Sequence, residues 1–404
     1  MMQLTKESLD SLTGRFGCPF YLFEETAFLN NARSLEAAMQ AHYGKYRIAY
    51  SFKTNYTPYI CRAVRKIGAY AEVVSGMEYE LAKRLGFPDR EINFNGPCKG
   101  KAGEEAFLNG CMIHVDSLDE LEGLCKLAKE HASASFQIGL RVNIDVGQGF
   151  LSRFGMDDED LARAFRMVFE VPNLKVAGLH CHISRCRGRD AWRQRTEILL
   201  ALADRFFDEV PAFLDLGSGM FGSMEPSFAA QFDNVPSYED YAGVTAALVA
   251  EHYRGKDGPW LITEPGTTLV SRYVDCVSRV QAIKTVRGHA FAVLNTGIHV
   301  LGETCTLKQL PVRVIPGGSP QDSFDAIDMT GYTCLEQDVL YRAFSGKLAV
   351  GDYVVFGNVG GYSNVLKPPF IQPNCAMVAH TDRNEYTLMK RAETGEDLLR
   401  TYVF

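Results

Sequence analysis

Eight short apolar runs, each followed by a turn and a helical pattern, occur in about the first 280 residues and constrain the fold more than any other feature. The runs cover residues 48–51, 71–74, 92–95, 112–116, 137–143, 174–180, 213–216 and 260–264, and helical periodicity covers residues 76–84, 118–131, 157–169, 189–208 and 238–253. Because each helix returns the chain to the same end of the sheet, the runs are expected to pair in parallel. Eight such units predict a (β/α)8 barrel, with an open, doubly wound sheet as the alternative.

The pattern changes after about residue 275. Strand-like runs at residues 274–285, 291–296, 310–315, 325–329 and 353–356 are separated by glycine and proline turns. They show little helical period and predict an antiparallel β-barrel domain. A further run at residues 20–23 could pair with that domain. The expected organisation is an N-terminal segment at 1–30, a barrel at 31–275 and a β domain at 276–404.

Charge and hydropathy exclude several classes of protein. The chain has 42 Lys plus Arg and 49 Asp plus Glu, a net charge of −7 without a basic cluster, which argues against nucleic-acid binding. No apolar run approaches the roughly 18 residues that cross a bilayer. The first residues lack the apolar core of a secretory signal. We therefore expect a cytoplasmic protein with no nucleic-acid or membrane partner.

The eleven cysteines are scattered at irregular spacing without a Cys-x-x-Cys pair, which favours reduced thiols over a zinc site. The sequence nearest to a metal-ligand cluster is His180-Cys181-His182, with Cys186 beyond it. On a strand the two histidines would share one face and Cys181 would point away. We expect no metal site.

The ends of the predicted barrel strands carry the residues suited to chemistry, because the loops of a (β/α)8 barrel meet there. Lys53 comes two residues after the first run, His180 ends the sixth with His182 two residues beyond it, and Glu264 ends the eighth. Three glycines follow the seventh run, at 217, 219 and 222, where backbone N–H groups can approach an anion closely. An amine, an imidazole, a carboxylate and an anion nest together are the parts that hold pyridoxal phosphate.

Several short motifs in a fixed order resemble the fold-type III pyridoxal-phosphate decarboxylases, the group that contains diaminopimelate and ornithine decarboxylases. They lie at residues 50–55 (YSFKTN), 74–78 (VSGME), 153–155 (RFG), 180–184 (HCHIS), 216–219 (LGSG), 264–266 (EPG), 331–338 (GYTCLEQD) and 360–362 (GGY). The resemblance covers nearly the whole chain. It implies an alanine racemase-like (β/α)8 barrel followed by a β domain, and a homodimer with two shared active sites.

The resemblance also implies roles for matching residues. Lys53 would carry pyridoxal 5'-phosphate as a Schiff base, His182 would stack on its ring, and Glu264 would pair with the ring nitrogen. The phosphate would be held by Gly217, Ser218, Gly219, Gly266 and Tyr362. Cys334 would cross the dimer interface and protonate the substrate carbon after CO2 leaves. The implied reaction is decarboxylation of an amino acid or a modified amino acid to an amine.

The chain departs from the family pattern at three places, which involve four residues. Thr267 stands where the family has an arginine after Glu-Pro-Gly, and Ser184 and Arg185 replace small residues after the imidazole. Arg185 is therefore a candidate to supply the missing positive charge. Leu335 replaces an acid that recognises the substrate's distal amine, with Glu336 and Asp338 nearby.

The altered motif after Cys334 resembles carboxynorspermidine decarboxylases, whereas much of the remaining chain resembles the diaminopimelate and siderophore-pathway enzymes. A modified or N-substituted amino acid is therefore a candidate substrate. The alternatives are a racemase or epimerase on the same scaffold and a non-enzymatic cofactor or partner binder. Glu264 argues against racemisation, because a protonated ring is a stronger electron sink, and Lys53 argues against loss of catalysis.

Overall fold

The computed structural model describes residues 4–147 and 149–404, which form two compact units. The barrel unit comprises Asn31–Gly222 and Asn234–Thr268, and the sheet unit comprises Met1–Asn30, Ser223–Asp233 and Leu269–Phe404. The chain passes between them four times: within α2 (Glu25–Gln40), after Gly222, after Asp233 and within α12 (Thr267–Val270). The predicted boundary at residue 275 thus lies seven residues beyond the observed end of the barrel unit (275 against 268).

The barrel unit contains a closed eight-stranded parallel barrel, which confirms the predicted fold and rules out the open sheet. Its strands are β2 (Tyr46–Ser51), β3 (Tyr70–Val73), β4 (Ile92–Phe94), β5 (Met112–Val115), β6 (Phe136–Arg141), β7 (Leu174–His180), β8 (Phe213–Asp215) and β9 (Trp260–Thr263). All eight predicted runs become strands of this barrel. Closure is made by the parallel pairing of β2 with β9.

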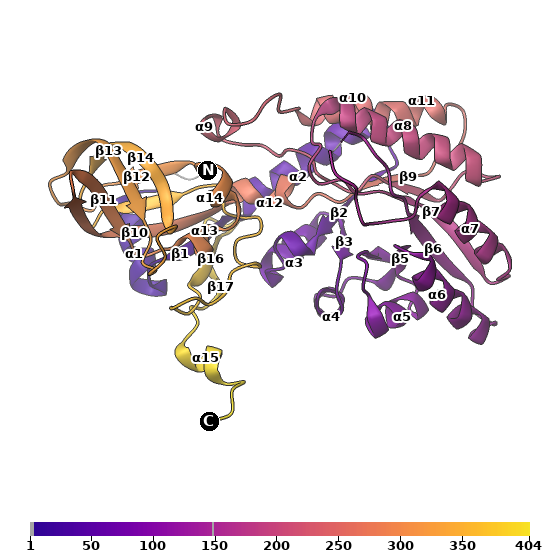
Figure 1. The fold of residues 1–404 in the computed structure, drawn as a ribbon, viewed down its shortest axis with the longest axis horizontal. Helices are drawn as coiled ribbons and strands as arrows, with labels where there is room; N and C mark the ends of the chain where they lie inside the picture. Colours follow the sequence, from indigo (N-terminus) through magenta and orange to yellow (C-terminus); the bar gives the residue numbers. More distant parts are fainter. Residues whose placement is uncertain (1–3, 148) are drawn as a thin grey trace. The chain divides into compact units, whose positions relative to one another are not determined.

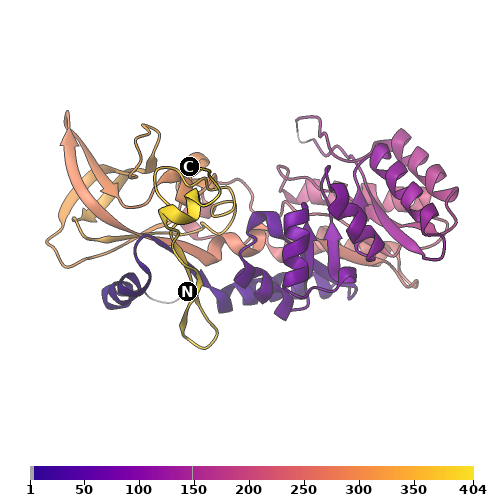
Figure 2. The same cartoon turned by 90° about the horizontal axis from the view of Figure 1, so that it is seen from below.

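Helices lie outside the barrel strands, as Figure 1 shows and Figure 2 repeats from below. They are α3 (Pro58–Lys66), α4 (Gly76–Arg84), α5 (Gly100–Leu108), α6 (Leu118–Glu130), α7 (Asp158–Phe169), α8 (Arg189–Phe206), α10 (Tyr238–Val244) and α11 (Ala246–His252), with 3-10 turns at Phe52–Thr54 and Asp89–Glu91. The prediction of a single helix at 238–253 is wrong, because the helix breaks at Thr245. The buried Thr245 hydroxyl donates to the carbonyl of Tyr241 (2.7 Å) and competes with the helical ladder.

The sheet unit is built on nine strands with the order β14-β13-β11-β10-β1-β16-β17, while β15 pairs with β10 and β12. The strands are β1 (Phe20–Glu24), β10 (Val274–Val286), β11 (His289–Leu294), β12 (Val312–Ile315), β13 (Asp322–Thr330), β14 (Val339–Leu348), β15 (Tyr353–Phe356), β16 (Ala376–His380) and β17 (Tyr386–Lys390). Short helices accompany them: α1 (Lys6–Phe16), α9 (Pro226–Ala229), α13 (Ile298–Leu301), α14 (Thr304–Leu307), α15 (Gly395–Leu399) and a 3-10 turn at Ser271–Tyr273.

The sheet is mixed, which corrects the expectation of a purely antiparallel domain. β1 pairs in parallel with β16, and β11 pairs in parallel with β13. The first pairing arises because β1 comes from the start of the chain and sits between β10 and β16, antiparallel to one and parallel to the other. Phe20 and Leu22 of β1 are fully buried in the core of this unit together with Val277, Val355 and Val378.

No helix among the described residues is long and apolar enough to cross a membrane.

Candidate active site

Lys53 lies in the turn that follows β2, at the carboxyl end of the barrel. Its Nζ atom is 2.8 and 2.9 Å from the two carboxylate oxygens of Glu72, on the neighbouring strand β3. Glu72 is fully buried and also accepts a hydrogen bond from Ser51 Oγ. Burial raises the pKa of Glu72, and the positive charge of Lys53 opposes that rise. The carboxylate therefore fixes the amine at the barrel mouth.

Glu264 follows β9 and is only 2% exposed. Its carboxylate accepts a hydrogen bond from Asn95 Nδ2 (2.6 Å) and lies 3.1 Å from His180 Nε2. The same Asn95 amide also donates to Glu72 (3.1 Å), so it links the carboxylate of Glu264 to the one that holds Lys53. The orientation of Glu264 is thus set by two neighbours on other strands.

Two further residues, His114 and Asp215, complete the buried group around Glu264, and the sequence analysis did not single them out. The ring of His114, on β5, stacks on that of His180 with centroids 4.5 Å apart, and Gly139 leaves room for it because a Cβ there would lie 2.5 Å from His114 Cδ2. Burial lowers the pKa of both histidines well below 6.5. Asp215, on β8, is also fully buried, and burial and then Glu264 raise its pKa well above 3.8.

His114, His180, Asp215 and Glu264 offer donor atoms that all lie within 4.8 Å of one another. Neutral imidazoles and carboxylates are donors that transition metals accept, so this group of described residues could hold an ion. It differs from the His180-Cys181-His182 cluster considered from the sequence. In the structure Cys181 is buried and His182 lies beyond the end of β7.

His182 and the glycine-rich turn after β8 are joined by a hydrogen bond. The backbone N–H of Ser218 donates to His182 Nδ1 (3.2 Å), which places the ring proton on Nε2. Burial, then the charges of Lys53 and Arg141, lower the pKa of His182 well below 6.5. The ring is therefore neutral and held in one orientation, as a stacking surface requires.

Gly217 and Gly219 cannot be replaced without moving the turn. Their φ angles are +59° and +103°, in the region that favours glycine. A Cβ at Gly217 would lie 2.5 Å from the carbonyl oxygen of Cys181, and one at Gly219 would lie 2.3 Å from that of Ile183. The turn after β8 thus packs directly on the turn after β7. Gly266 is similarly confined, since a Cβ there would lie 2.0 Å from Thr54 Oγ1.

Arg195, on α8, holds these two turns together and was also missed from the sequence. Its fully buried guanidinium donates to the carbonyls of Leu216 (2.9 Å), Ser218 (2.9 Å) and Ile183 (3.1 Å). A buried arginine in a helical pattern looks like a surface residue in sequence. Only its packing against the turns reveals its role.

The remaining predicted residues are divided between the units. Arg185 is exposed in the barrel unit, with its guanidinium 5.3 Å from the ring centroid of Phe150. Cys334, Glu336, Asp338 and Tyr362 lie in the sheet unit. Cys334 and Glu336 are exposed, and Tyr362 is half-buried with a φ of +54°.

Asp338 is buried, in contrast to its neighbours in the loop between β13 and β14. Its carboxylate accepts hydrogen bonds from the backbone N–H groups of Ile298 (2.7 Å) and Thr333 (2.9 Å). These bonds hold the loop that carries Cys334. Glu336 makes no such contact among the described residues.

Comparison with known proteins shows the family. Residues 29–271 match the pyridoxal-dependent decarboxylase family, pyridoxal binding domain, and residues 211–360 match its C-terminal sheet domain. The chain belongs to this family. It is thus a pyridoxal-phosphate-dependent enzyme that decarboxylates an amino acid, and the match does not favour the racemase alternative.

Relatives match the chain over nearly its full length, and solved structures share its fold. The chain is 26% identical to diaminopimelate decarboxylase of Methanocaldococcus jannaschii (96% of this chain, 92% of the relative) and 27% identical to that of Synechocystis (97% and 88%). The crystal structure of the M. jannaschii enzyme has a TM-score of 0.86 at 23% identity, covering 98% of this chain and 94% of that one. A lysine/ornithine decarboxylase from Vibrio vulnificus, complexed with putrescine, has a TM-score of 0.75 at 20% identity and shares the fold, covering 93% and 97%.

The residues of the barrel fit the cofactor. Pyridoxal phosphate presents a carbonyl, a pyridine nitrogen and a phosphate, and the barrel mouth offers an amine, a carboxylate and a glycine turn to match them. The turn at Gly217 and Gly219 is a place that a Cβ would fill, and the neutral ring of His182 is beside it.

Proposed function

We propose that Lys53, Glu264, His182 and the turn at residues 217–219 form the cofactor site of this decarboxylase. The observation that supports this most is their placement on four consecutive barrel strands, β7, β8, β9 and β2, all at the carboxyl end. Lys53 would attach the cofactor, and Glu264 would pair with its ring nitrogen. Gly217, Ser218, Gly219 and Gly266 would surround the phosphate, together with Tyr362 of the sheet unit.

The chemistry that pyridoxal phosphate supplies when bound is an electron sink for the carbanion left by the departing CO2. The chain's own contribution is electrostatic and positional. Glu264, fixed by Asn95 and His180, would keep the ring nitrogen protonated. His182, neutral and held by Ser218, would cover one ring face without adding charge.

Protonation of the product carbon falls to Cys334 in this proposal. Its exposure on a loop held by Asp338 leaves the thiol open to a second copy of the chain. We therefore propose a homodimer in which each copy completes the partner's site. Cytoplasmic location is proposed as well, because the irregular cysteine spacing suits a reducing compartment.

The substrate is proposed to be an amino acid related to, but not restricted to, meso-diaminopimelate. The curated relatives carry the name diaminopimelate decarboxylase, which supports a substrate of that size and polarity. Leu335 and Thr267 stand at positions where the family has charged residues. A modified or N-substituted amino acid therefore remains a proposed substrate, with Arg185, Glu336 and Asp338 as candidate contacts.

Borohydride reduction followed by peptide mapping tests the cofactor site directly. The protein purified with its cofactor should carry a pyridoxyl group on the peptide that contains Lys53, and Lys53→Ala should carry none. Lys99, which is buried just before α5 and pairs with Glu120, is the control and should stay unmodified. A pyridoxyl group on any other lysine would contradict the proposed site.

A further inference from the structure

His114 is a polar residue at a position that suits an apolar one. It lies within β5, between the buried residues Ile113 and Val115, and its own side chain is fully buried. Neither of its ring nitrogens has a hydrogen-bond partner among the described residues. A buried polar group without a partner destabilises a protein, and an aliphatic side chain would avoid this loss. The imidazole therefore calls for an explanation other than packing.

The barrel is shaped to admit the ring of His114. On β6, Gly139 leaves the space, since a Cβ there would lie 2.5 Å from His114 Cδ2 and 3.2 Å from its Nε2. On β7, the ring of His180 stacks on it, with centroids 4.5 Å apart and an angle of 18° between the ring planes. On β8, the centroid of the Phe213 ring lies 5.4 Å away. Residues of three strands thus confine the imidazole.

The confined ring faces the carboxylate of Glu264. Its Nδ1 atom is 4.0 Å from Glu264 Oε1, the oxygen that accepts a hydrogen bond from Asn95. The other oxygen, Oε2, is 3.1 Å from His180 Nε2. Because Glu264 is buried, these side chains, and not bulk water, surround its charge. At 4.0 Å His114 makes no hydrogen bond, but the dipole of an N–H group acts on a buried charge over that distance.

Neutral donors matter for this carboxylate, because two further carboxyl groups lie close to it. Asp215 and Glu264 offer oxygens within 4.8 Å of each other, and Glu72 shares the Asn95 amide with Glu264. The nearby cation, Lys53, is paired with Glu72. Carboxyl groups crowded in a buried site disfavour one another's ionisation, whereas N–H groups directed at a carboxylate favour it. An ionised Glu264 thus depends on the N–H groups around it.

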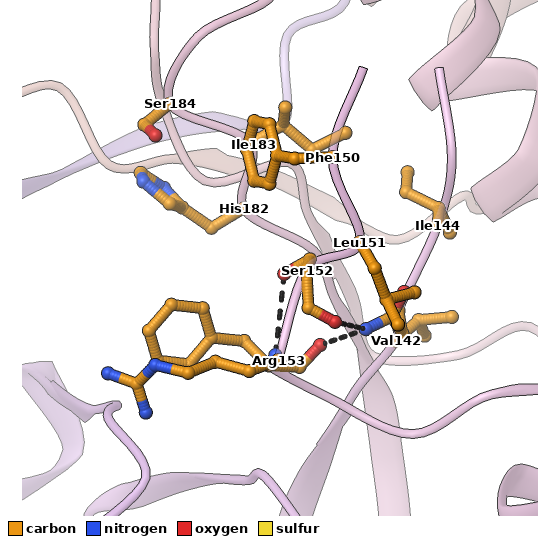
Figure 3. Close-up of a pocket in the computed structure, with 11 residues that line it drawn as sticks. Val142, Ile144, Phe150, Leu151, Ser152, Arg153, His182, Ile183 and Ser184 are labelled. Carbon is orange, nitrogen blue, oxygen red and sulfur yellow. Dashed lines mark hydrogen bonds between the residues drawn. The ribbon is translucent and has the colours of Figure 1, made fainter. Parts of the chain in front are cut away.

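His114 does not line the open space beside the site. The cavity of about 290 Å3 next to His182, drawn in Figure 3, is lined by residues that follow β6 and β7 and by the loop at 150–154. A molecule in that cavity would meet His182 and the loop rather than His114. Any effect of His114 on the reaction must therefore pass through the residues that it faces, His180 and Glu264.

We propose that His114 is a positioning residue for decarboxylation, which keeps Glu264 ionised by stacking on His180 and by directing the N–H of Nδ1 at Glu264 Oε1. A carboxylate stabilised in this way has a lower affinity for a proton, so the proton between it and the cofactor stays on the ring nitrogen. The inference rests on the proposed function, because it takes Glu264 to pair with that nitrogen. His114 itself touches neither cofactor nor substrate.

Binding of two cofactors to the cofactor-free protein tests the proposal without turnover. One is pyridoxal phosphate, and the other is its 1-deaza analogue, in which a CH group replaces the ring nitrogen. Pyridoxal phosphate should bind more tightly, because only it presents a ring N–H to Glu264. His114→Leu should reduce this preference by roughly three- to tenfold. An unchanged preference in His114→Leu would overturn the proposal.

Further measurements separate the role of Nδ1 from packing. His114→Asn places an amide nitrogen near the position of Nδ1 and should retain most of the preference. His252→Leu, at a surface histidine paired with Asp204, is the matched control and should retain all of it. The cofactor-free His114→Leu protein should unfold at the same temperature as the unchanged protein or higher, since leucine leaves no nitrogen unpaired. A melting temperature that falls together with the preference would indicate a packing role and contradict the proposal.

Turnover and binding together separate this inference from the proposed function. If His114→Leu lowers kcat for CO2 release by roughly three- to tenfold and leaves KM unchanged, both stand. If the unchanged protein binds the two cofactors equally, the pairing of Glu264 with the ring nitrogen fails, and the proposed cofactor site fails with it. If the unchanged protein prefers pyridoxal phosphate and His114→Leu retains that preference, only the role of His114 fails.

Discussion

Lys53 Nζ lies 2.8 and 2.9 Å from the two carboxylate oxygens of Glu72, which comes from the adjacent barrel strand. The amine proposed to carry the cofactor is thus held in place by a buried charge. Replacing that carboxylate by an amide removes the ion pair and leaves the amine free to leave the strand end.

Glu72→Gln should therefore lower kcat/KM by roughly tenfold or more, and Glu72→Asp should fall between it and the unchanged protein. Steady-state CO2 release measures both. Glu80→Gln removes an exposed carboxylate that pairs with Arg84 and should leave kcat/KM unchanged. An effect of the Glu80 variant as large as that of Glu72→Gln would show that general charge loss, not the Lys53 contact, is responsible.

Gly219→Ala should disrupt the turn after β8. The new Cβ would lie 2.3 Å from the carbonyl oxygen of Ile183, at a φ of +103°. We expect a loss of roughly 1–3 kcal/mol in stability and much weaker cofactor retention, measured by thermal unfolding and by cofactor absorbance after dialysis. Gly123→Ala, on α6 with open space around it, should be neutral or stabilising by about 0.5–1 kcal/mol. Normal retention in Gly219→Ala would argue against a phosphate site there.

Asp215→Asn should change how stability depends on pH. Burial raises the pKa of folded Asp215 well above 3.8, so the folded protein keeps a proton that the unfolded chain releases above about pH 4. The unchanged protein therefore loses stability as pH rises from there to the folded pKa, and the asparagine variant escapes this loss. The free energy of unfolding of the asparagine variant, relative to that of the unchanged protein, should therefore grow by up to about 1.4 kcal/mol per pH unit between about pH 4 and the pKa of folded Asp215.

Unfolding midpoints measured between pH 5 and 8 test this relation. Asp208→Asn, at an exposed residue just after α8 that makes no ion pair among the described residues, is the control and should show no such trend. An asparagine variant at 215 that loses stability relative to the unchanged protein as pH rises would mean that Asp215 is ionised in the folded state.

Mixing two inactive variants tests the proposed shared sites. Lys53→Ala and Cys334→Ala lie in different units of the chain. If each copy supplies Cys334 to the site of its partner, mixed dimers carry one intact site, and an equal mixture should recover roughly a quarter of the original activity. No recovery after subunit exchange, verified by native mass spectrometry, would contradict shared sites.

Much of the barrel could be predicted because a parallel barrel repeats one pattern eight times, and residues that end apolar strands, such as Lys53 and Glu264, stand out in it. His114 lies inside β5, and Asp215, which ends β8, lies inside the apolar run predicted at 213–216. Side chains at such positions are expected to belong to the core, so the sequence pattern does not single out these two residues. Their importance comes from neighbours on other strands.

The sheet unit was predicted less completely. β14, β16 and β17 were missed because the pattern was weak. β14 contains a Ser-Gly step, and every residue of β17 is exposed or half-buried. The parallel contact of β1 with β16 joins residues more than 350 positions apart, a distance over which local sequence carries no register information.

Decarboxylation through a carbanion at the former α-carbon is the central claim, and isotope labelling measures it directly. The cofactor-loaded protein in deuterated water would receive meso-diaminopimelate, lysine, ornithine, arginine and glutamate, each labelled with carbon-13 in the α-carboxylate. At least one of these amino acids should give labelled CO2 and an amine that carries one deuterium at the former α-carbon. Deuterium uptake without release of labelled CO2 would contradict the account and indicate a racemase.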